Sequence, residues 1–237
     1  DEDGKFIQES CYAMDITEEW NWQNTLIKSN AEKTVLIKEV HHRVKNNLQT
    51  ITSLISLEER FKTDPAKILD ITKTRINALA LIHETIYNEF DMNYISIKDF
   101  FSSFDDKLKL LSSHPDIVFN EDIEDLTLYI DTATPLVLMI NELTTNSFKH
   151  AFEKEDENKE IYKSLKSYEE NGVKMCKFHY KDNGKGLPED IDSIGSLGWI
   201  IVKSLITQVD GKYEIFNDNG FNFVLTFPYI ENIEEEL

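Results

Sequence analysis

Two adjacent histidines, His41 and His42, lie in a stretch that reads EVHHRVKNNLQTITSLISL. If this stretch is a helix turning by about 100° per residue, His41 falls at the edge of the apolar stripe and His42 faces water. A neutral imidazole, with a pKa of about 6.5, is a competent nucleophile, and Glu39 could hold the proton of its other nitrogen. The pattern indicates phosphoryl acceptance by His42, with a plain solvated face as the alternative. Nitrogen donors suited to a phosphoryl group follow: Arg43, Lys45 and Asn46.

A second group of polar residues lies in NELTTNSFKH, residues 141–150. At helical spacing, four of them share one face, and the opposite face carries apolar side chains for the core. Carboxylate and amide oxygens can hold Mg²⁺, and nitrogen donors can contact phosphates. A solvated amphipathic face is the alternative. The four residues are Glu142, Asn146, Lys149 and His150.

Two glycine pairs follow this stretch. Asp182 ends an expected strand and precedes Gly184 and Gly186, which free the backbone for close approach of a ligand. Gly195 and Gly198 open an expected helix, whose N-terminal amides are suited to phosphate. A hairpin turn is the alternative for the first pair. The order of polar helix, Asp-x-Gly-x-Gly and Gly-x-x-Gly indicates a nucleotide site.

A long helix must present the histidines. From residues 15–20, DITEEW, to Pro65 the chain contains neither Gly nor Pro, and Asp15 and Glu18 have capping-box spacing. Apolar residues recur there at near-heptad spacing, which is typical of a coiled coil or bundle. A second amphipathic helix follows the turn TDPAK. Two such hairpins would pair as a four-helix bundle, so we expect a homodimer. The second helix has on one face Ile68, Ile71, Arg75, Leu79, Ile82 and Ile86.

From Tyr94 onward, expected strands are mixed with separated helices. This pattern predicts an α+β fold in which an α/β two-layer sandwich follows the helical hairpin. We expect one of the helices to begin with Thr134 as its N-cap and Pro135 in its first turn. A strand pair should turn at Asn171-Gly172. The expected strands are 94–97, 116–123, 126–131 and the pairs within 159–182 and 212–227; the expected helices are 96–113, 134–152 and 197–211.

Composition limits the partners. The chain has 237 residues and a net charge of −19, so it should repel nucleic acid and anionic membranes. No apolar run is long enough to span a membrane. Cys11 and Cys176 lack metal-binding spacing and fit a reducing cytosol, so we expect a cytoplasmic location. The chain opens DEDGKFIQES without Met, which suggests a piece of a longer protein.

The nucleotide motifs resemble, in this order, the N, G1 and G2 boxes of the Bergerat-fold (GHKL) ATP-binding domains. HHRVKNNLQ resembles the acceptor box of one subfamily of sensor histidine kinases of two-component systems, and RINALALIHETIY resembles its second bundle helix. DEDGKFIQESCYAMDITEEW resembles the end of a PAS sensor domain. The resemblance implies a PAS remnant at 1–16, a coiled-coil signalling helix at 17–36, a dimerisation and acceptor hairpin at 37–92, an ATP-binding domain at 93–230 and an acidic tail at 231–237.

The resemblance also implies a role for each site residue. His42 would be phosphorylated because it directly precedes Arg43, with His41 a lesser possibility. The commoner histidine kinases have an acidic residue where Arg43 stands, so the base role could fall to Glu39. Asn146 would hold Mg²⁺ between the phosphates. The other implied roles are general base or metal positioning for Glu142, phosphate contacts for Lys149 and His150, the adenine amino group for Asp182, the nucleotide wall for Gly184 and Gly186, and the lid and phosphate end for Gly195 and Gly198.

The implied function is ATP-dependent autophosphorylation on a histidine in response to a sensor domain, with onward transfer to an aspartate of a response regulator. ATP and Mg²⁺ are the implied cofactors. One alternative is a non-catalytic dimeric sensor scaffold that binds nucleotide only to set conformation. Another is an ATP-hydrolysing Bergerat-fold machine, which needs no histidine hairpin. The sequence departs from the family in a short lid between Gly186 and Gly195, and in Phe221 where Thr is frequent.

Overall fold

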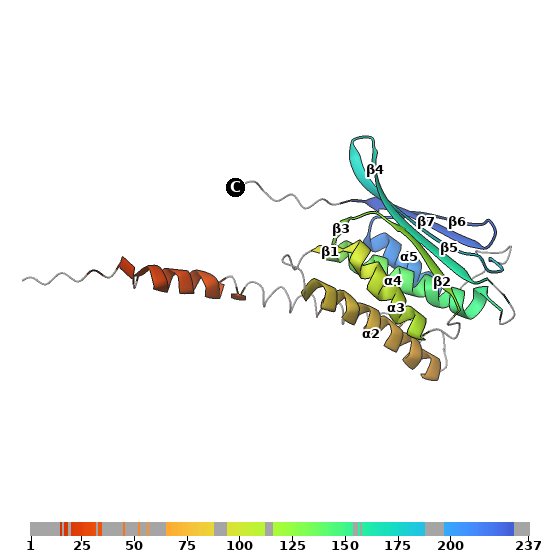
Figure 1. Cartoon of the computed structure of the whole chain (residues 1–237), viewed down its shortest axis with the longest axis horizontal. Coiled ribbons are helices and arrows are strands. Elements are labelled where there is room, and N and C mark those ends of the chain that lie inside the picture. The colour runs from red at the N-terminus through yellow and green to blue at the C-terminus, as the bar shows by residue number, and fades with distance from the viewer. Residues whose placement is uncertain are drawn as a thin grey trace, which may run out of the picture. The chain divides into compact units, whose positions relative to one another are not determined.

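A computed structural model describes residues 15, 17–18, 20–31, 33–34, 45, 52, 56, 65–87, 94–111, 116–153, 156, 158–187 and 197–229. The chain divides into two compact units, residues 1–50 and 51–237. In the first unit, residues 20–31 are helical (Figure 1). Asp15 Oδ1 accepts hydrogen bonds from the Thr17 amide at 2.9 Å and from its hydroxyl at 2.6 Å, which lowers the pKa of Asp15. Apart from Asp15, the predicted PAS remnant at 1–16 lies outside the described residues.

The second unit alternates helices with strands, as the sequence predicts. Its helices are α2 (Pro65–Tyr87), α3 (Ile97–Leu111), α4 (Ile130–Asn146), the π-helical segment η1 (Ser147–Ala151) and α5 (Leu197–Gln208). Its strands are β1 (Tyr94–Ser96), β2 (Val118–Ile123), β3 (Thr127–Tyr129), β4 (Glu160–Glu170), β5 (Val173–Asp182), β6 (Lys212–Asn217) and β7 (Phe221–Pro228).

Five strands form one mixed sheet in the order β2-β4-β5-β7-β6. The β2–β4 pair is parallel and the other pairs are antiparallel, while β1 and β3 form a separate antiparallel pair. Helices α3, α4 and α5 lie along one side of the sheet (Figure 1). The expected turn between β4 and β5 is confirmed: Asn171 and Gly172 have positive φ values of 52° and 77°. The predicted α+β two-layer sandwich is therefore confirmed.

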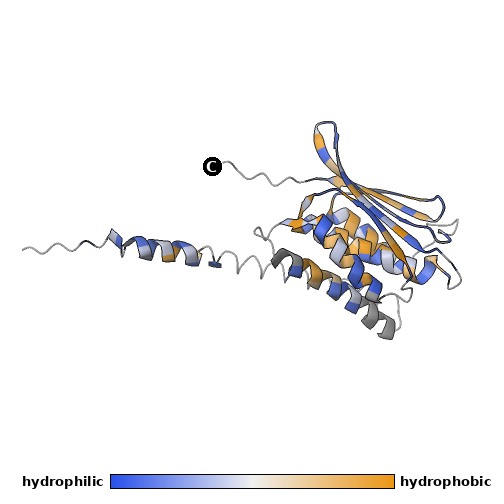
Figure 2. Cartoon of the chain, viewed as in Figure 1, coloured by the Kyte–Doolittle hydropathy of each residue, from blue (hydrophilic) through white to orange (hydrophobic). Residues whose placement is uncertain are grey.

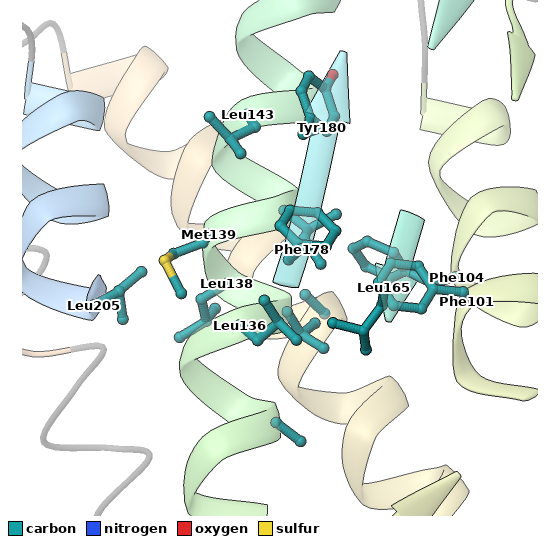
Figure 3. Packing of buried hydrophobic residues seen from close by; sticks show 14 of the residues in the cluster. Phe101, Phe104, Leu136, Leu138, Met139, Leu143, Leu165, Phe178, Tyr180 and Leu205 are labelled. Atoms are coloured by element: carbon teal, nitrogen blue, oxygen red, sulfur yellow. The ribbon is translucent and has the colours of Figure 1, made fainter. Parts of the chain in front are cut away.

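The core lies between this sheet and the helices. Alternate residues of β5 are buried, so Phe178 and Tyr180 point toward α4 together with the last residue of the strand, Asp182. Figure 3 shows Phe178 and Tyr180 on the strand next to α4, with Met139 on the side of α4 toward Leu205. Orange apolar residues gather where the sheet and the helices face each other (Figure 2). The strand period thus carries a carboxylate to the helix side of the sheet.

Helix α4 begins earlier than the sequence indicates. We expected Thr134 as the N-cap, but the N-cap is Tyr129, and Pro135 lies inside the helix. A proline there removes one amide donor, the one that would bond the carbonyl of the residue four positions back, Asp131. The extra turn buries Ile130 and Ala133 in the core, which offsets that loss. The expected Thr134 cap is therefore wrong, because burial outweighs the local proline signal.

Helix α2 packs against the sandwich. Arg75, Leu79 and Ile82 are buried, which confirms that part of the predicted face. Leu79 and Ile82 belong to the same apolar cluster as the sandwich core. The helix contacts α4, α3 and β1. The predicted second helix of the hairpin is therefore packed into the compact unit that holds the sheet. Within the part of the chain that the structure describes, every helix is too short or too polar to cross a bilayer.

Candidate functional site

A cavity of about 420 Å³ opens between the end of α4, the start of α5 and strands β6 and β7. This volume lies in the range usual for small-molecule pockets, roughly 300–1,000 Å³. Its lining residues come from α4, η1, β5 and the loop after it, α5, β6 and β7, so segments far apart in the sequence meet around one space. Five of the residues that the sequence analysis singled out line it: Asn146, His150, Asp182, Gly186 and Gly198.

Asp182 is buried at the wall of the cavity and is held by several donors. Ser147 Oγ donates to Asp182 Oδ2 at 2.6 Å, and Tyr180 Oη donates to Ser147 Oγ at 2.9 Å. The amides of Gly184 and Phe221 donate to the other oxygen, Oδ1, at 3.1 and 3.3 Å. Burial raises the pKa of the Tyr180 phenol, so that it stays a donor. The network fixes the orientation of the carboxylate beside the cavity.

Two glycines allow backbone segments to meet around Asp182. A Cβ at Gly184 would lie 2.4 Å from the carbonyl oxygen of Ala151, and a Cβ at Gly220 would lie 2.0 Å from that of Asp182. Gly220 also has a φ of 111°, in the region that favours glycine. Gly184 is one of the predicted site residues, whereas Gly220 is not. The sequence Asn219-Gly220 indicates a turn, but it does not reveal that the backbone of Gly220 packs against that of Asp182.

The loop after β5 is tied to β6. Asn217 Oδ1 accepts a hydrogen bond from the Leu187 amide at 2.9 Å, and Asn217 Nδ2 donates to the Leu187 carbonyl at 2.8 Å. Gly186 has a φ of 71° and lies beside the same asparagine. The two bonds of Asn217 mimic a short strand pairing. They hold the Asp-x-Gly-x-Gly loop at the rim of the cavity.

Polar side chains of α4 meet the first turn of α5. A Cβ at Gly198 would lie 3.5 Å from both Asn146 Nδ2 and Glu142 Oε2, so these atoms lie close to the backbone of α5. Helix α5 has 12 residues, and the amides of its first turn lack partners within the helix. Asn146 and Gly198 line the cavity, and the Glu142 carboxylate lies beside them although it does not line the cavity itself.

Glu142 does not lie on a solvated face. Its side chain is only 7% exposed, and Oε1 accepts a hydrogen bond from Arg75 Nε of α2 at 2.7 Å. Asn146 and His150 line the cavity, whereas the exposed Lys149 does not. The π-helical segment η1 explains part of this difference, because its wider turn changes the rotation per residue after Asn146. The four residues therefore do not share one face as predicted: Asn146 and His150 line the cavity, Glu142 is buried against Arg75, and Lys149 is exposed.

Positive charge gathers at the cavity mouth of an acidic chain. Lys185 lines the cavity, and its amide donates to the Ala151 carbonyl at 3.1 Å. The pKa of His150 is lowered, chiefly by burial and then by the charges of Lys149 and Lys185. The sequence analysis missed Lys185, although a cation between two glycines was a visible signal. These groups suit an anionic ligand.

The remaining wall of the cavity is apolar. It consists of Leu143, Ala151, Leu187, Trp199, Ile215 and Phe221, from α4, η1, the loop, α5, β6 and β7. Trp199 packs edge-on against Tyr213, with ring centroids 5.6 Å apart, which holds the indole in place. An apolar wall facing a fixed carboxylate is suited to a flat ring system that carries a hydrogen-bond donor. The cavity thus has an apolar part and a polar part.

A divalent metal ion would need phosphate oxygens of a bound nucleotide to complete its coordination at this site. Across the described positions, no group of three or more His, Cys, Asp or Glu residues is arranged to hold a metal. The amide oxygen of Asn146 and the carboxylate oxygen Oε2 of Glu142 are ligand types that Mg²⁺ accepts, usually beside phosphate oxygens and water. The residues present therefore fit a Mg²⁺ ion that enters together with phosphates. His42, Glu39 and Gly195 lie outside the described residues.

Known proteins match the chain in sequence. A family model described as "Histidine kinase" matches residues 39–112, which include the predicted acceptor box. The chain is 27% identical over 241 residues to the sensor histidine kinase PdtaS of Mycolicibacterium smegmatis, covering 95% of this chain and 45% of the relative. It is 26% identical over 190 residues to blue-light-activated histidine kinase 2 of Erythrobacter litoralis, covering 76% and 52%. The chain spans about half the length of these curated relatives.

Solved structures match the fold. A blue-light activated histidine kinase of Erythrobacter litoralis superposes with a TM-score of 0.63 at 23% identity, covering 81% of this chain and 62% of that chain. The histidine kinase domain of the same protein gives a TM-score of 0.57 at 18% identity, covering 78% and 94%. The chain is therefore similar in sequence to sensor histidine kinases, and it shares its fold with solved histidine kinase structures.

Proposed function

We propose that this chain binds MgATP in the cavity and transfers the γ-phosphoryl group to His42. One observation carries the proposal: the cavity joins a fixed carboxylate and an apolar wall to an amide, cations and a helix N-terminus. This combination matches the three parts of ATP, namely its base, its phosphates and their metal. The match of the histidine kinase family model to residues 39–112, which include His42, supports a histidine in this segment as the acceptor.

The base would lie on the apolar wall. Asp182 accepts hydrogen bonds, so its carboxylate suits the adenine amino group, and the Ser147–Tyr180 network keeps the carboxylate in place. Gly184 and Gly186 keep the adjoining loop close to the ligand. The side chains of Trp199 and Phe221 would cover the ring. Binding of the adenine would not take part in the reaction itself, but it would position the triphosphate for the transfer.

The phosphates would lie at the other end. Asn146 would hold Mg²⁺ through its amide oxygen, and the ion would neutralise charge on the phosphates. His150 and Lys185 line this space as further donors, and the exposed Lys149 lies next to them in the sequence. Gly198, and Gly195 before it, belong to the segment that would cover the phosphates. The donors outweigh the acidity of the whole chain locally, because charge acts mainly within a Debye length of about 8–10 Å.

The transfer step breaks the bond between the γ-phosphorus and the bridging oxygen of ADP. It forms a bond between that phosphorus and a nitrogen of His42. Phosphoryl transfer passes through a loose transition state, so alignment and charge neutralisation supply most of the catalysis. Glu39 would orient the imidazole through its other nitrogen, and Glu142 would act as general base or position the metal. An aspartate in the receiver domain of a response regulator would accept the phosphoryl group next.

Signal input and assembly are part of the same proposal. The predicted hairpin at 37–92 would form the homodimer, and a PAS sensor domain before residue 17 would set its conformation. A shift of the rod that carries His42 relative to the sandwich would align or misalign the imidazole with the γ-phosphate. The chain that binds ATP and the chain that is phosphorylated can then be the same or partners. Mixing two variants, one without His42 and one without Asp182, distinguishes these cases.

The deciding experiment uses ATP labelled on the γ-phosphate. We expect the wild-type chain to take up label that is stable to base and lost in acid, as for a phosphohistidine. His42→Gln should abolish this label, whereas the matched change His41→Gln should leave it. Label that persists in His42→Gln and disappears in His41→Gln would move the acceptor to His41. A wild-type chain that binds ATP but takes up no label would instead favour the nucleotide-binding scaffold.

A further inference from the structure

Glu142 uses its two carboxylate oxygens in different directions. Oε1 accepts the hydrogen bond from Arg75 Nε at 2.7 Å, in an ion pair whose side chains are 4% and 7% exposed. Oε2 lies beside the backbone of Gly198, next to the Asn146 amide. The carboxylate therefore joins Arg75 of α2 to two residues that line the cavity, Asn146 and Gly198. A buried carboxylate such as that of Glu142 is stable in one orientation only while its charged partner, Arg75, stays in place.

From this geometry we infer that Arg75 is a positioning residue for Glu142. By binding Oε1, Arg75 orients the carboxylate so that Oε2 points to the place where the proposed function puts the Mg²⁺-bound phosphates. The inference rests on that proposed function, but it adds a residue from outside the nucleotide boxes. Neither Arg75 nor Glu142 lines the cavity, so Arg75 would act through Glu142 on the neighbouring lining residues Asn146 and Gly198. It makes α2 part of the support of the site.

The ion pair also connects two helices that lie far apart in the sequence. Arg75 lies on α2, which the sequence predicts to be the second helix of the acceptor hairpin, whereas Glu142 lies 67 residues later on α4. Thr72, one turn before Arg75, is partly buried, and its Oγ1 atom is buried without a hydrogen-bond partner. A contact between helices that keeps an unsatisfied polar atom is less stable than a fully apolar one. The ion pair therefore links the predicted acceptor hairpin to the helix that carries Asn146.

The test measures how strongly Mg²⁺ strengthens ATP binding. For each full-length variant, the ratio of the dissociation constant in EDTA to that in Mg²⁺ is determined by equilibrium titration. A purely structural defect changes both constants alike and leaves this ratio unchanged. Loss of a residue that orients a metal ligand typically lowers metal affinity about 10–100-fold. We therefore expect Arg75→Gln to lower the ratio about tenfold or more.

Matched variants decide the cause. Lys73→Gln makes the same change at an exposed cation of α2 and should leave the ratio within about twofold of wild type. Glu142→Gln should lower the ratio, and Arg75→Gln added to it should lower it no further, because Arg75 acts through Glu142. A wild-type ratio in Arg75→Gln, or fully additive effects in the double variant, would overturn the inference.

Folding and the proposed function are controlled separately. If thermal melting shows that Arg75→Gln does not fold, Arg75→Lys carries the test, because it keeps the charge but loses the planar guanidinium. Its ratio should fall about threefold with little loss of melting temperature, and an unchanged ratio would overturn the inference. A wild-type chain whose ATP binding is absent or ignores Mg²⁺ would refute the proposed function, and the inference with it. A wild-type response with no effect of Arg75 refutes the inference alone.

Discussion

At the scale of single residues, Asp182 shows how a site is built by its neighbours. The carboxylate ends a strand whose alternate residues are buried, so it points to the helix side of the sheet. There Ser147 donates to one oxygen, and two amides donate to the other. Ser147 directly follows Asn146, so the same segment supports both ends of the cavity. Ser147 thus belongs to the site without contributing to a sequence motif.

We expect Ser147→Ala to weaken ATP binding. The change removes the donor to Asp182 Oδ2 and leaves the carboxylate freer to turn. Loss of such a hydrogen bond costs about 0.5–1.5 kcal/mol, which corresponds to an affinity lower by roughly 2- to 12-fold. Equilibrium titration with ATP measures the effect. Ser103→Ala, the same change on the exposed face of α3, is the control, and equal affinities for the two variants would contradict the role of Ser147.

At the scale of elements, a buried charge group joins α3 to the sheet. Lys163 of β4 is fully buried, pairs with Asp105 of α3, and lies 3.4 Å from Glu121 of β2. The rings of Phe101 and Phe119 lie 4.9 and 5.0 Å from its ammonium group. Burial raises the pKa of Asp105 to about 7, since desolvation outweighs the attraction of Lys163. The contact between α3 and the sheet should therefore depend on pH.

The sign of this dependence follows from proton binding. Between its unfolded value of 3.8 and about 7, Asp105 binds more protons in the folded than in the unfolded state, so its contribution to the free energy of unfolding falls as pH rises. Relative to Asp105→Asn, the wild-type chain should therefore lose on the order of 2 kcal/mol between about pH 5 and pH 8. Urea unfolding at both pH values measures this. Asp106→Asn, at the exposed neighbour, should run parallel to wild type, and a parallel Asp105→Asn would refute the raised pKa.

At the scale of the whole molecule, helix α2 belongs structurally with the sandwich. Its residues Leu79, Leu81 and Ile82 are buried in the same cluster as the helices beneath the sheet, and Arg75 joins it to Glu142. The resemblance instead places α2 in a separate hairpin that ends at residue 92. The structural unit therefore begins at residue 51, whereas the resemblance implies that the ATP-binding domain begins at residue 93.

Truncation tests this division. A fragment of residues 51–237, which keeps α2, should melt in one cooperative transition. A fragment of residues 94–237 should have a free energy of unfolding lower by several kcal/mol, because burial of each Leu or Ile contributes about 1.5–3 kcal/mol. It should also bind a hydrophobic dye at the uncovered face of α4. Equal melting temperatures for the two fragments would show that α2 contributes nothing to the sandwich.

The sequence by itself determined the fold class and identified five of the residues that line the cavity. The order of the three boxes, the turn at Asn171-Gly172 and the alternation along β5 are local patterns, and local periodicity decides which face an element buries. Only the tertiary structure decided what covers each face. It paired Glu142 with Arg75, brought Gly220 against Asp182 and changed the helical phase after Asn146. Periodicity cannot predict such contacts, because their partners lie tens of residues apart and meet only when the layers pack.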